Sequence, residues 1–382
     1  MRKKLIKQVK DCFIKEFKQD PLLIFSPGRI NIIGEHTDYN QGFVFPAAID
    51  KGIITGIEKS TNAVCTAISL DFNTTINFSL DNLKPSKNNT WLNYIIGVVA
   101  EIKKVNNKLG NFNLVFTGNI PSGAGMSSSA ALENSVVFGL NTLFNLNLSK
   151  HDMILISQKA EHNYVGVKCG IMDQYASMFG IENNALHLDC RTTEANPYKI
   201  DFKNYELVLI NTNVKHQLSD SAYNDRRNAC EQVASVLNIK ALRDATEKDL
   251  LTIKHKISTD NYNKALYIVQ ENLRTIKAAQ AIKQNNLETL GNLIYQSHEG
   301  LSNLYKVSCN ELDFLVEQTK NNPKILGARM MGGGFGGCTI NLIARSEVKA
   351  FADSASKAYK NKFDKDCSVY FIELAEGTHI VK

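Results

Sequence analysis

The first half of the chain alternates short hydrophobic runs with polar breaks, a pattern typical of β-strands. The runs LLIF, RINII, FVFPAAI, GIITGIE and NFNLVFTG are rich in β-branched or aromatic residues, and Gly, Asn, Asp and Ser separate them. Helical segments accompany these runs: Leu5, Val9 and Phe13 share one face near the N-terminus, a second apolar face follows Trp91, and a long helical segment extends from about Ser127 to Leu146. The sequence therefore predicts strands with helices packed against them.

The second half is predicted to be mainly helical, from Ser221 to about Thr319. Its clearest segments are NYNKALYIVQENLRTIKAAQAIKQ and LETLGNLIYQSHEGLSNLY. A strand, a helix and a strand follow in CTINLIA, SEVKAFADSASKAY and CSVYFIELA. A chain of 382 residues is long for one core, so we expect two domains, residues 1–195 and residues 196–382. Small ligands commonly bind in the cleft between two domains.

Composition narrows the classes of function. The formal net charge of +6 comes from Lys and Arg spread over the whole chain without a basic stripe, which argues against nucleic acid binding. Eight cysteines without a C-x-x-C pair predict free thiols rather than a disulfide framework or a zinc site. Because no apolar run approaches the ~18 residues of a membrane span, we expect a cytoplasmic protein that binds no membrane.

The segment RINIIGEHTDY concentrates ionisable side chains in an otherwise apolar stretch. It contains Arg29, Glu35, His36 and Asp38. Burying such groups is costly unless each has a partner. Three interpretations are open: the acidic groups and the histidine hold a metal, they are fixed donors and acceptors for another ligand, or they form a polar turn.

The loop PSGAGMSSSAA, residues 121–131, follows a predicted strand and leads into a predicted helix that begins near Ser127. Gly123 and Gly125 allow close backbone approach to an anion, and the helix N-terminus offers unpaired N–H groups. The segment therefore predicts a phosphate-binding loop, although it lacks the lysine of G-x-x-x-x-G-K-[ST]. A small-residue turn before a helix is the alternative.

A second glycine-rich loop, MMGGGFGGC at residues 330–338, formally contains G-x-G-x-x-G. A dinucleotide-binding fingerprint must open a helix, whereas the CTINLI that continues this loop alternates like a strand. We therefore reject a dinucleotide-dependent oxidoreductase. The glycines either permit close approach to a ligand or form a tight turn without a function.

Two further carboxyl groups need an explanation. Asp173 lies in the small and apolar segment KCGIMDQYASMFG, where a charged group needs an internal partner, whether structural or catalytic. Glu161 and His162 end a helix-like segment, where a solvent-exposed face is the simplest interpretation. Neither Glu-His pair has the H-E-x-x-H spacing of a zinc protease.

In this order along the chain, the motifs resemble those of the galactokinase branch of the GHMP small-molecule kinases. GRINIIGEHTDYNQGFVFPAAID resembles the segment that defines galactokinases, PSGAGMSSSAAL the phosphate loop of the family, and MMGGGFGGC its third motif. The resemblance extends from about Phe25 to Leu342, and two departures are visible: Met126, where many members have Leu, and Gln41, where an acidic residue is common. It implies an α+β two-domain GHMP kinase fold, with an N-terminal ribosomal-protein-S5-like domain, a C-terminal ferredoxin-like domain and the active site in the cleft.

The resemblance also implies roles for individual residues. Asp173 would be the catalytic carboxylate that faces the C1 hydroxyl of galactose, and Arg29 would lie between it and the transferred phosphoryl group. Trp91 would line the adenine pocket. The other sugar hydroxyls would be bound by Glu35, His36, Asp38, Gly170 and Tyr223. ATP phosphates would be held by Gly123, Ala124, Gly125, Met126, Ser127, Ser128, Ser129 and Ala130.

Magnesium would be bound by Glu161 and one serine of the phosphate loop, for which Ser128 is favoured while Ser127 and Ser129 remain open. The implied reaction is ATP-dependent phosphorylation of α-D-galactose at C1, the first committed step of galactose catabolism by the Leloir route, by a monomer that binds galactose, ATP and Mg²⁺. Two alternatives remain: an anomeric kinase for another sugar, such as N-acetylgalactosamine or arabinose, and a non-catalytic sensor of galactose and ATP.

Overall fold

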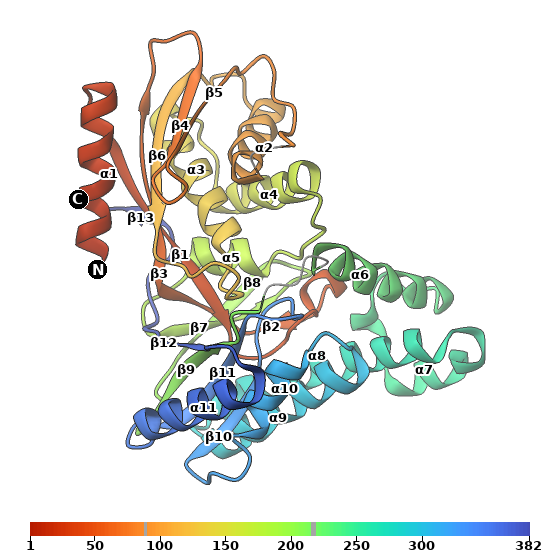
Figure 1. Ribbon diagram of the computed structural model, residues 1–382. Coiled ribbons are helices and arrows are strands. Elements are labelled where there is room, and N and C mark those ends of the chain that lie inside the picture. Colours follow the sequence, from red (N-terminus) through yellow and green to blue (C-terminus); the bar gives the residue numbers. More distant parts are fainter. Residues whose placement is uncertain (88–89, 215–218) are drawn as a thin grey trace.

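The computed structural model describes residues 1–87, 90–214 and 219–382. Figure 1 shows two parts of different composition. The upper part is a large sheet with helices on both faces, and the lower part is rich in helices and contains a smaller sheet.

The larger sheet has six strands in the order β13-β1-β3-β6-β4-β5. Their bounds are β1 (Leu22–Asn31), β3 (Pro46–Lys59), β4 (Cys65–Ser69), β5 (Thr74–Phe78), β6 (Phe112–Gly118) and β13 (His379–Ile380). Neighbouring strands are antiparallel except β4 and β6, which are parallel. The last strand of the chain therefore pairs with the first.

Helices cover both faces of this sheet. On one face lies α1 (Arg2–Phe17), whose Val9 and Phe13 belong to one buried cluster with Phe25 and Val115. The other face is covered by α2 (Thr90–Val105), α3 (Ser128–Phe144), α4 (Lys150–Ala160) and α5 (Met172–Phe179). The predicted helices at the N-terminus and around Trp91 are confirmed, because their apolar faces are the buried ones.

Two smaller sheets complete the fold, and both are antiparallel. The three-stranded sheet contains β2 (Phe43–Val44), β7 (Asn184–Asp189) and β8 (Glu194–Lys199). The four-stranded sheet has the order β10-β11-β9-β12, with bounds β9 (Tyr205–Asn211), β10 (Ile325–Met330), β11 (Cys338–Ala344) and β12 (Ser368–Phe371).

The second half of the chain supplies most of the remaining helices, as its sequence predicts. They are α6 (Ser219–Val236), α7 (Glu247–Ile253), α8 (Thr259–Lys283), α9 (Leu287–Glu299), α10 (Asn310–Glu317) and α11 (Val348–Phe363). Short helical turns are η1 (Asp38–Asn40), η2 (Glu161–Val165), η3 (Leu242–Asp244), η4 (Lys254–Lys256) and η5 (Gly300–Leu304). Leu315 of α10 and Phe351 of α11 are buried with Val208 and Ile343, so both helices cover the four-stranded sheet.

The sequence pattern did not indicate the strands between residues 184 and 211, nor β10. The clearest case is β8, which reads EANPYK and is paired on one side only. A strand at a sheet edge tolerates proline and needs few β-branched residues, so local propensity does not reveal it. Residue 195, where the domain boundary is expected, lies inside β8.

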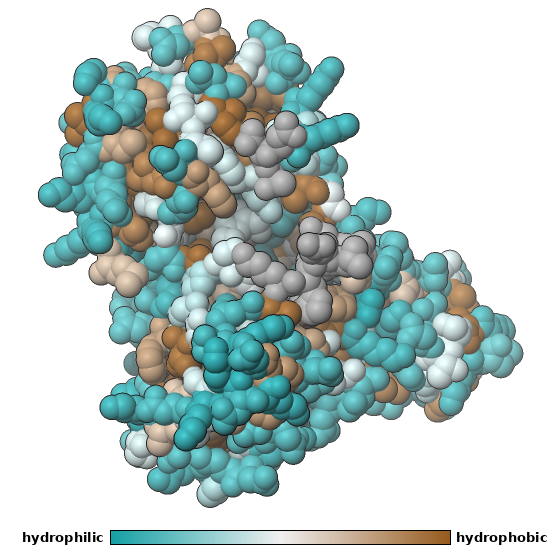
Figure 2. Space-filling view, in the orientation of Figure 1, coloured by the Kyte–Doolittle hydropathy of each residue, from teal (hydrophilic) through white to brown (hydrophobic). Residues whose placement is uncertain are grey.

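One face of the molecule can be judged from its hydropathy. Hydrophilic residues predominate on the face shown in Figure 2, most clearly over the lower part, where α11 lies. Among the described residues, no helix has both the length and the apolar character needed to cross a lipid bilayer.

Arg329 of β10 joins the four-stranded sheet to the end of β1. Its side chain is fully buried. Nε donates a hydrogen bond to the carbonyl oxygen of Ile32 over 3.0 Å, and Nη2 donates to the carbonyl oxygen of Asn31. Nη1 donates to Oε1 of Glu35, also over 3.0 Å. A guanidinium offers five N–H donors in a rigid fork, so this one side chain satisfies several buried acceptors.

Replacing Arg329 by methionine should destabilise the protein strongly. Arg329→Met keeps much of the buried volume but leaves Glu35 and two carbonyl oxygens without their donor, and removing one partner of a buried ion pair typically costs about 3 to 5 kcal/mol. Urea-induced unfolding would measure the loss. The control is Arg345→Met at an exposed arginine, which should change the free energy of unfolding by less than ~0.5 kcal/mol. Equal stabilities of the two variants would contradict the role given to Arg329.

Candidate active site

The segment after β1 folds as a compact polar turn that is almost entirely buried. The hydroxyl of Thr37 donates to the carbonyl oxygens of Gly34 and Phe43 over 2.9 and 2.6 Å. The amide of Gly34, whose φ is 99°, donates to Glu271 of α8 over 2.9 Å. These bonds explain how polar backbone is accommodated away from water. The turn directs three side chains into one cavity: Glu35, His36 and Asp38.

Glu35 is held by the second half of the chain. Its Oε1 accepts hydrogen bonds from Arg329 Nη1 and, over 2.8 Å, from the backbone amide of Gly332. Within the described part of the chain, no group of three or more His, Cys, Asp or Glu side chains could hold a metal ion. The hydrogen bonds of Glu35 favour the interpretation of RINIIGEHTDY as a set of fixed hydrogen-bonding groups over a metal site.

Asp38 opens η1 and packs directly on Gly170. A Cβ atom at position 170 would lie 2.0 Å from Oδ2 of Asp38, so any other residue there would displace the carboxylate. Burial and, second, the nearby Asp173 raise the pKa of Asp38 to about 7. The charge of this carboxyl group is thus poorly compensated by the protein itself.

His36 lies among aromatic rings. Its ring centroid is 5.8 Å from that of Tyr39, 5.3 Å from that of Tyr223 and 5.0 Å from that of Tyr305. Burial and, second, the positive charge of Arg226 lower the pKa of His36 to about 3. The imidazole is therefore neutral near pH 7 and can act as one hydrogen-bond donor and one acceptor.

The internal partner expected for Asp173 is Arg29. Nε of Arg29 donates to Oδ1 over 2.8 Å and Nη2 donates to Oδ2 over 2.9 Å, which is the bidentate geometry of an arginine with a carboxylate. The hydroxyl of Ser127 also donates to Oδ2. Arg29 is buried on β1, whereas the side chain of Asp173, in the first turn of α5, keeps 25% of its surface exposed. Asp173 can therefore contact a ligand while Arg29 supports it.

The glycine-serine loop is tied to the same pair. Arg29 donates through its backbone amide to the carbonyl oxygen of Met126 over 3.1 Å and through Nη1 to that of Gly125. Gly123 and Gly125 both have φ of 70°, and Ser127 has φ of 58°, so the chain turns sharply before α3 begins at Ser128. The structure confirms the predicted order of strand, loop and helix, with the helix N-terminus facing the loop cavity.

The second glycine-rich loop packs against the first. A Cβ atom on Gly125 would lie 3.0 Å from the carbonyl oxygen of Met331, and one on Gly337 would lie 3.2 Å from that of Gly123. The loop continues into β11 and opens no helix, which confirms that it is not a dinucleotide fingerprint. Its glycines permit close contact between two loops, and Gly332, Gly333 and Gly334 line the cavities beside them, which favours the interpretation as close approach to a ligand.

Glu161 does not lie on a solvent-exposed face, as its position at the end of a helix suggested. It is buried, and Oε2 accepts a hydrogen bond from Nε2 of Gln174 over 2.9 Å. The hydroxyl of Ser129 also interacts with this carboxyl group. Burial and, second, Asp173 raise the pKa of Glu161 to about 7, and the buried Glu133 lies on the other side of Gln174.

Two adjoining cavities contain most of the predicted residues. The first, of about 110 Å³, is lined by the side chains that follow β1, and the second, of about 360 Å³, is lined by the loop from Gly123 to Ser129. Both cavities are lined by Arg29, Glu161, Asp173 and Tyr223. The predicted sugar-binding side chains and the predicted phosphate-binding loop therefore adjoin at the Arg29–Asp173 pair.

Three predicted residues line neither cavity. Gly170 and Ala130 are buried behind the side chains that do, and Trp91 is buried in the core, where its ring lies 5.3 Å from that of Phe116. Trp91 therefore does not line these two cavities, and its place in an adenine pocket stays a prediction. Tyr94, one turn further along α2, is the aromatic residue of that helix that lines the larger cavity.

Several polar residues that build the site were not identified from the sequence. They are Tyr39, Glu133, Gln174, Glu271, Tyr305 and Arg329. A signal exists for Glu133, because AALENSVV places one acid within an apolar helix face. Tyr39 and Gln174 stand within segments that the sequence singles out for other residues, and Glu271, Tyr305 and Arg329 are revealed only by their partners from distant parts of the chain.

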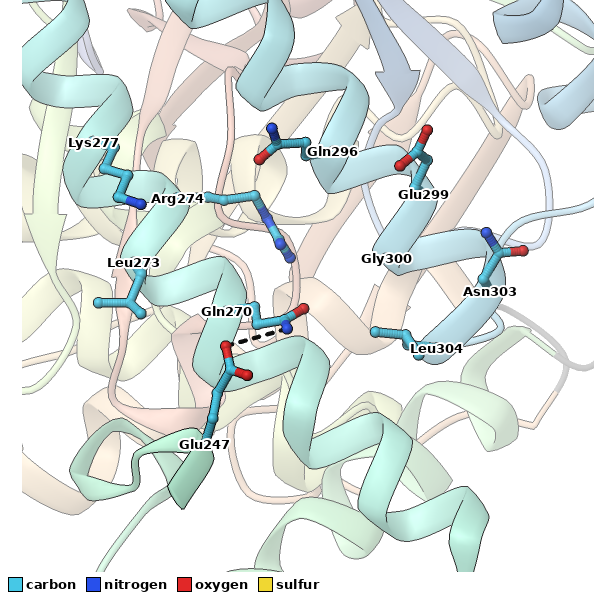
Figure 3. Close-up of a pocket in the computed structure, with 10 residues that line it drawn as sticks. All are labelled: Glu247, Gln270, Leu273, Arg274, Lys277, Gln296, Glu299, Gly300, Asn303 and Leu304. Carbon is cyan, nitrogen blue, oxygen red and sulfur yellow. Dashed lines mark hydrogen bonds between the residues drawn. The ribbon is translucent and has the colours of Figure 1, made fainter. Parts of the chain in front are cut away.

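A separate cavity of about 500 Å³ lies between α8, α9 and η5, with Glu247 of α7 at its edge (Figure 3). Arg274 points into this space, and its Nε donates to Oε2 of Glu271 over 2.6 Å. None of the predicted site residues lines it.

Three family models match this chain. The galactokinase galactose-binding signature matches residues 11–59, the N-terminal domain of GHMP kinases matches residues 93–181, and the C-terminal domain of GHMP kinases matches residues 278–361. The matched regions include the turn after β1, the glycine-serine loop, Glu161, Asp173 and the second glycine-rich loop.

Whole-chain similarity is also high. Galactokinase of Clostridium perfringens is 40% identical over 378 residues, which is 97% of this chain and 98% of that protein, and galactokinase of Thermotoga maritima is 39% identical over 92% and 98%. The crystal structure of Lactococcus lactis galactokinase complexed with galactose has a TM-score of 0.94 at 34% identity and covers 98% of this chain and 99% of that one. Methanococcus jannaschii mevalonate kinase shares the fold at a TM-score of 0.65 and 18% identity, over 94% of this chain and all of that one. With this fold, these loops and these relatives, the chain belongs to the galactokinase family of the GHMP kinases.

Proposed function

We propose that the chain transfers the γ-phosphoryl group of ATP to the C1 hydroxyl of α-D-galactose, giving α-D-galactose 1-phosphate and ADP, through the residues of the two adjoining cavities. The observation that carries this proposal is the position of Arg29 and Asp173 on the wall that both cavities share. A sugar in the smaller cavity and the phosphates of a nucleotide in the larger one would meet at these two side chains.

The smaller cavity has the groups that a sugar needs. Hydroxyl groups donate and accept hydrogen bonds, and Glu35 and Asp38 supply acceptors while the neutral His36 supplies a ring nitrogen. Tyr223 adds a phenol from α6. Gly170 contributes space rather than a contact, because a side chain there would displace Asp38.

Asp173 orients the attacking hydroxyl. Two hydrogen bonds from Arg29 and one from Ser127 fix the orientation of its carboxyl group. Phosphoryl transfer passes through a loose transition state, for which alignment of the nucleophile matters more than early removal of its proton. Asp173 therefore aims the C1 hydroxyl at the γ-phosphorus and accepts the proton late.

The glycine-serine loop suits the phosphates of ATP. Its glycines leave backbone N–H groups uncovered, and the N-terminus of α3 adds the positive end of a helix dipole. Arg29, which also donates to the Gly125 carbonyl oxygen, links the loop to Asp173. Movement of the phosphates and of the hydroxyl relative to each other is thereby restricted.

Magnesium fits the acidic wall of the larger cavity. Burial and then neighbouring carboxylates raise the pKa of both Glu161 and Glu133, so a divalent cation would offset negative charge that the protein leaves partly uncompensated. We propose that Glu161 and the loop serines hold the ion together with ATP, since Ser128 lines the cavity and Ser129 interacts with Glu161. The bound ion would stabilise charge on the phosphoryl oxygens.

The direct test is to incubate the protein with Mg²⁺ and ATP and either galactose, N-acetylgalactosamine or arabinose, and to record phosphorus NMR spectra. We expect the signal of galactose 1-phosphate and much weaker signals with the other two sugars. Formation of ADP without a sugar phosphate, or a faster reaction with another sugar, would overturn the proposal.

Asp173→Asn should abolish most turnover while leaving both substrates bound. The amide keeps the size of the side chain but loses the charge that orients and deprotonates the hydroxyl, a contribution of about 10² to 10⁴ in rate. Stopped-time assays would give kcat, and calorimetry would give the Kd of galactose and of ATP. Asp353→Asn on the exposed side of α11 serves as control and should change neither. An unchanged kcat for Asp173→Asn would mean that another group activates the hydroxyl.

Asp38→Asn should mainly raise the galactose KM. A buried polar contact contributes on the order of 1 to 3 kcal/mol, which corresponds to an increase of roughly 5- to 150-fold, and it acts equally on the bound sugar and on the transition state. Steady-state kinetics with galactose varied at saturating ATP would measure it. A KM equal to that of the unmodified protein would show that Asp38 does not contact the sugar.

Glu161→Gln should change both the magnesium requirement and the pH dependence of stability. The pKa of Glu161 is raised from its ordinary 4.5 to about 7, so without metal the unmodified protein loses stability as pH rises through this range. The glutamine variant does not titrate there. We therefore compare the free energy of unfolding of the variant with that of the unmodified protein at each pH. The value for the variant minus the value for the unmodified protein should be larger at about pH 8 than at about pH 5.

The same variant should need more Mg²⁺ for half-maximal activity, because one oxygen ligand has lost its charge. Urea unfolding in the presence of a chelator and activity at graded Mg²⁺ concentrations measure the two effects independently. A stability difference that is the same at both pH values, together with an unchanged Mg²⁺ requirement, would contradict the assignment.

A further inference from the structure

A chain of hydrogen bonds runs from His36 away from the cavity. Nδ1 of His36 is 2.8 Å from Oη of Tyr39, which is 2.7 Å from Oη of Tyr305, and Tyr305 Oη is 3.3 Å from Sγ of Cys230. His36, Tyr305 and Cys230 are each at most 3% exposed. The chain connects the turn after β1 with η5 and α6, three segments that are distant in sequence.

Each phenol carries one proton, so the chain can run in two directions. In the first, the thiol donates to Tyr305, Tyr305 donates to Tyr39, and Tyr39 donates to Nδ1, which leaves the imidazole proton on Nε2. In the second, Nδ1 carries the proton and donates to Tyr39, and the last acceptor is the sulfur atom of Cys230.

The first direction matches donors and acceptors better. A phenol is a stronger acid than a neutral imidazole N–H, and an imidazole nitrogen is a stronger acceptor than a phenol oxygen or a thiol sulfur. The second direction would use the weakest acceptor of the chain at its end and would make the imidazole nitrogen the donor. Because His36, Tyr305 and Cys230 are buried and Tyr39 is only partly exposed, water has little access to these bonds, and the difference between the two directions is largely retained.

The other nitrogen of the ring, Nε2, is buried. Within the described part of the chain it makes no hydrogen bond of full geometry, although the backbone of Gly333 interacts with the imidazole. The imidazole lines the same cavity as Glu35 and Asp38. A buried polar atom without a partner is costly, and a ligand that supplies the missing partner removes this cost on binding.

We propose that Tyr39, aligned by Tyr305 and Cys230, is a positioning residue that fixes the Nε2–H tautomer of His36, so that this nitrogen donates a hydrogen bond to an oxygen of the bound galactose. The tautomer follows from the hydrogen bonds of the protein alone, whereas the contact with galactose rests on the proposed function. The cavity then offers acceptors on Glu35 and Asp38 and a donor on His36. A sugar analogue that lacks the oxygen bound by His36 would lose this hydrogen bond. A side chain at position 36 that can only accept hydrogen bonds could not replace the donor.

Nitrogen NMR of the protein labelled with ¹⁵N-histidine tests the tautomer directly. Two-bond correlations between ring protons and ring nitrogens identify the nitrogen that carries the proton, and the spectrum of His36→Gln identifies the signals of His36 among the eight histidines. The pKa of about 3 keeps the ring neutral at pH 7, so no charged form obscures the result. We expect the proton on Nε2 in the protein without ligands. A proton on Nδ1 would overturn the proposal.

Tyr39→Phe tests the positioning role. The variant keeps the ring contacts with His36 and Tyr223 and removes only the hydroxyl. We expect an observable population of the Nδ1–H tautomer and a galactose KM raised about 10-fold with kcat nearly unchanged, because the lost bond acts on the bound sugar and on the transition state alike.

The matched control is Tyr295→Phe, which removes a similar hydroxyl pair with Thr319 at 2.8 Å, away from both cavities. It should change neither the spectrum of His36 nor the galactose KM. If Tyr39→Phe leaves the tautomer and the KM unchanged, Tyr39 is not a positioning residue. Since the NMR spectrum needs neither galactose nor ATP, a failure of the proposed function would appear as absent galactose binding with the Nε2–H signal intact.

Discussion

The buried guanidinium of Arg329 is the interaction on which the rest of the structure depends. It stands on β10 of the four-stranded sheet and donates to Asn31 and Ile32 at the end of β1, so it holds the two main sheets together. It also donates to Glu35. A buried carboxylate without a donor is unstable, and therefore the arginine that joins the sheets also holds a cavity-lining residue in place. Arg329 therefore contributes both to the stability of the fold and to the geometry of the site.

A second guanidinium, that of Arg29, organises the wall that the two cavities share. Arg29 uses its backbone amide, Nη1, Nε and Nη2 to connect the glycine-serine loop with Asp173. Even so, the cavities contain more carboxylates than cations, and burial raises the pKa of Asp38 and Glu161. This excess of negative charge is a property of the protein before ligands bind. Hydroxyl donors on one side and a cation on the other would relieve it, which agrees with the proposed binding of a sugar and of ATP with magnesium.

The glycines around the cavities share one structural role besides backbone flexibility, which is to let neighbouring atoms approach closely. Gly125 and Gly337 lie where the two loops touch, and Gly170 lies where a side chain would meet Asp38. In each case the neighbour is a backbone or carboxylate atom that takes part in the site. Removing a Cβ atom is the simplest way to let such atoms approach, and it explains why the glycine-rich motifs stand at the cavities rather than elsewhere in the fold.

The sequence by itself determined the motifs, their order and the local structure around them. The strand, loop and helix of the glycine-serine segment, the strand after MMGGGFGGC and the helices around Val9 and Trp91 follow from periodicity and glycine placement, which are local properties. The family resemblance then supplied the expected partners of Asp173. What only the tertiary structure decided were relations between distant residues: that Glu161 is buried beside Gln174, that Trp91 packs in the core, and that Arg329 satisfies Glu35. The physical reason is that burial and hydrogen bonding depend on which segments meet, and periodicity along one segment carries no information about its partner.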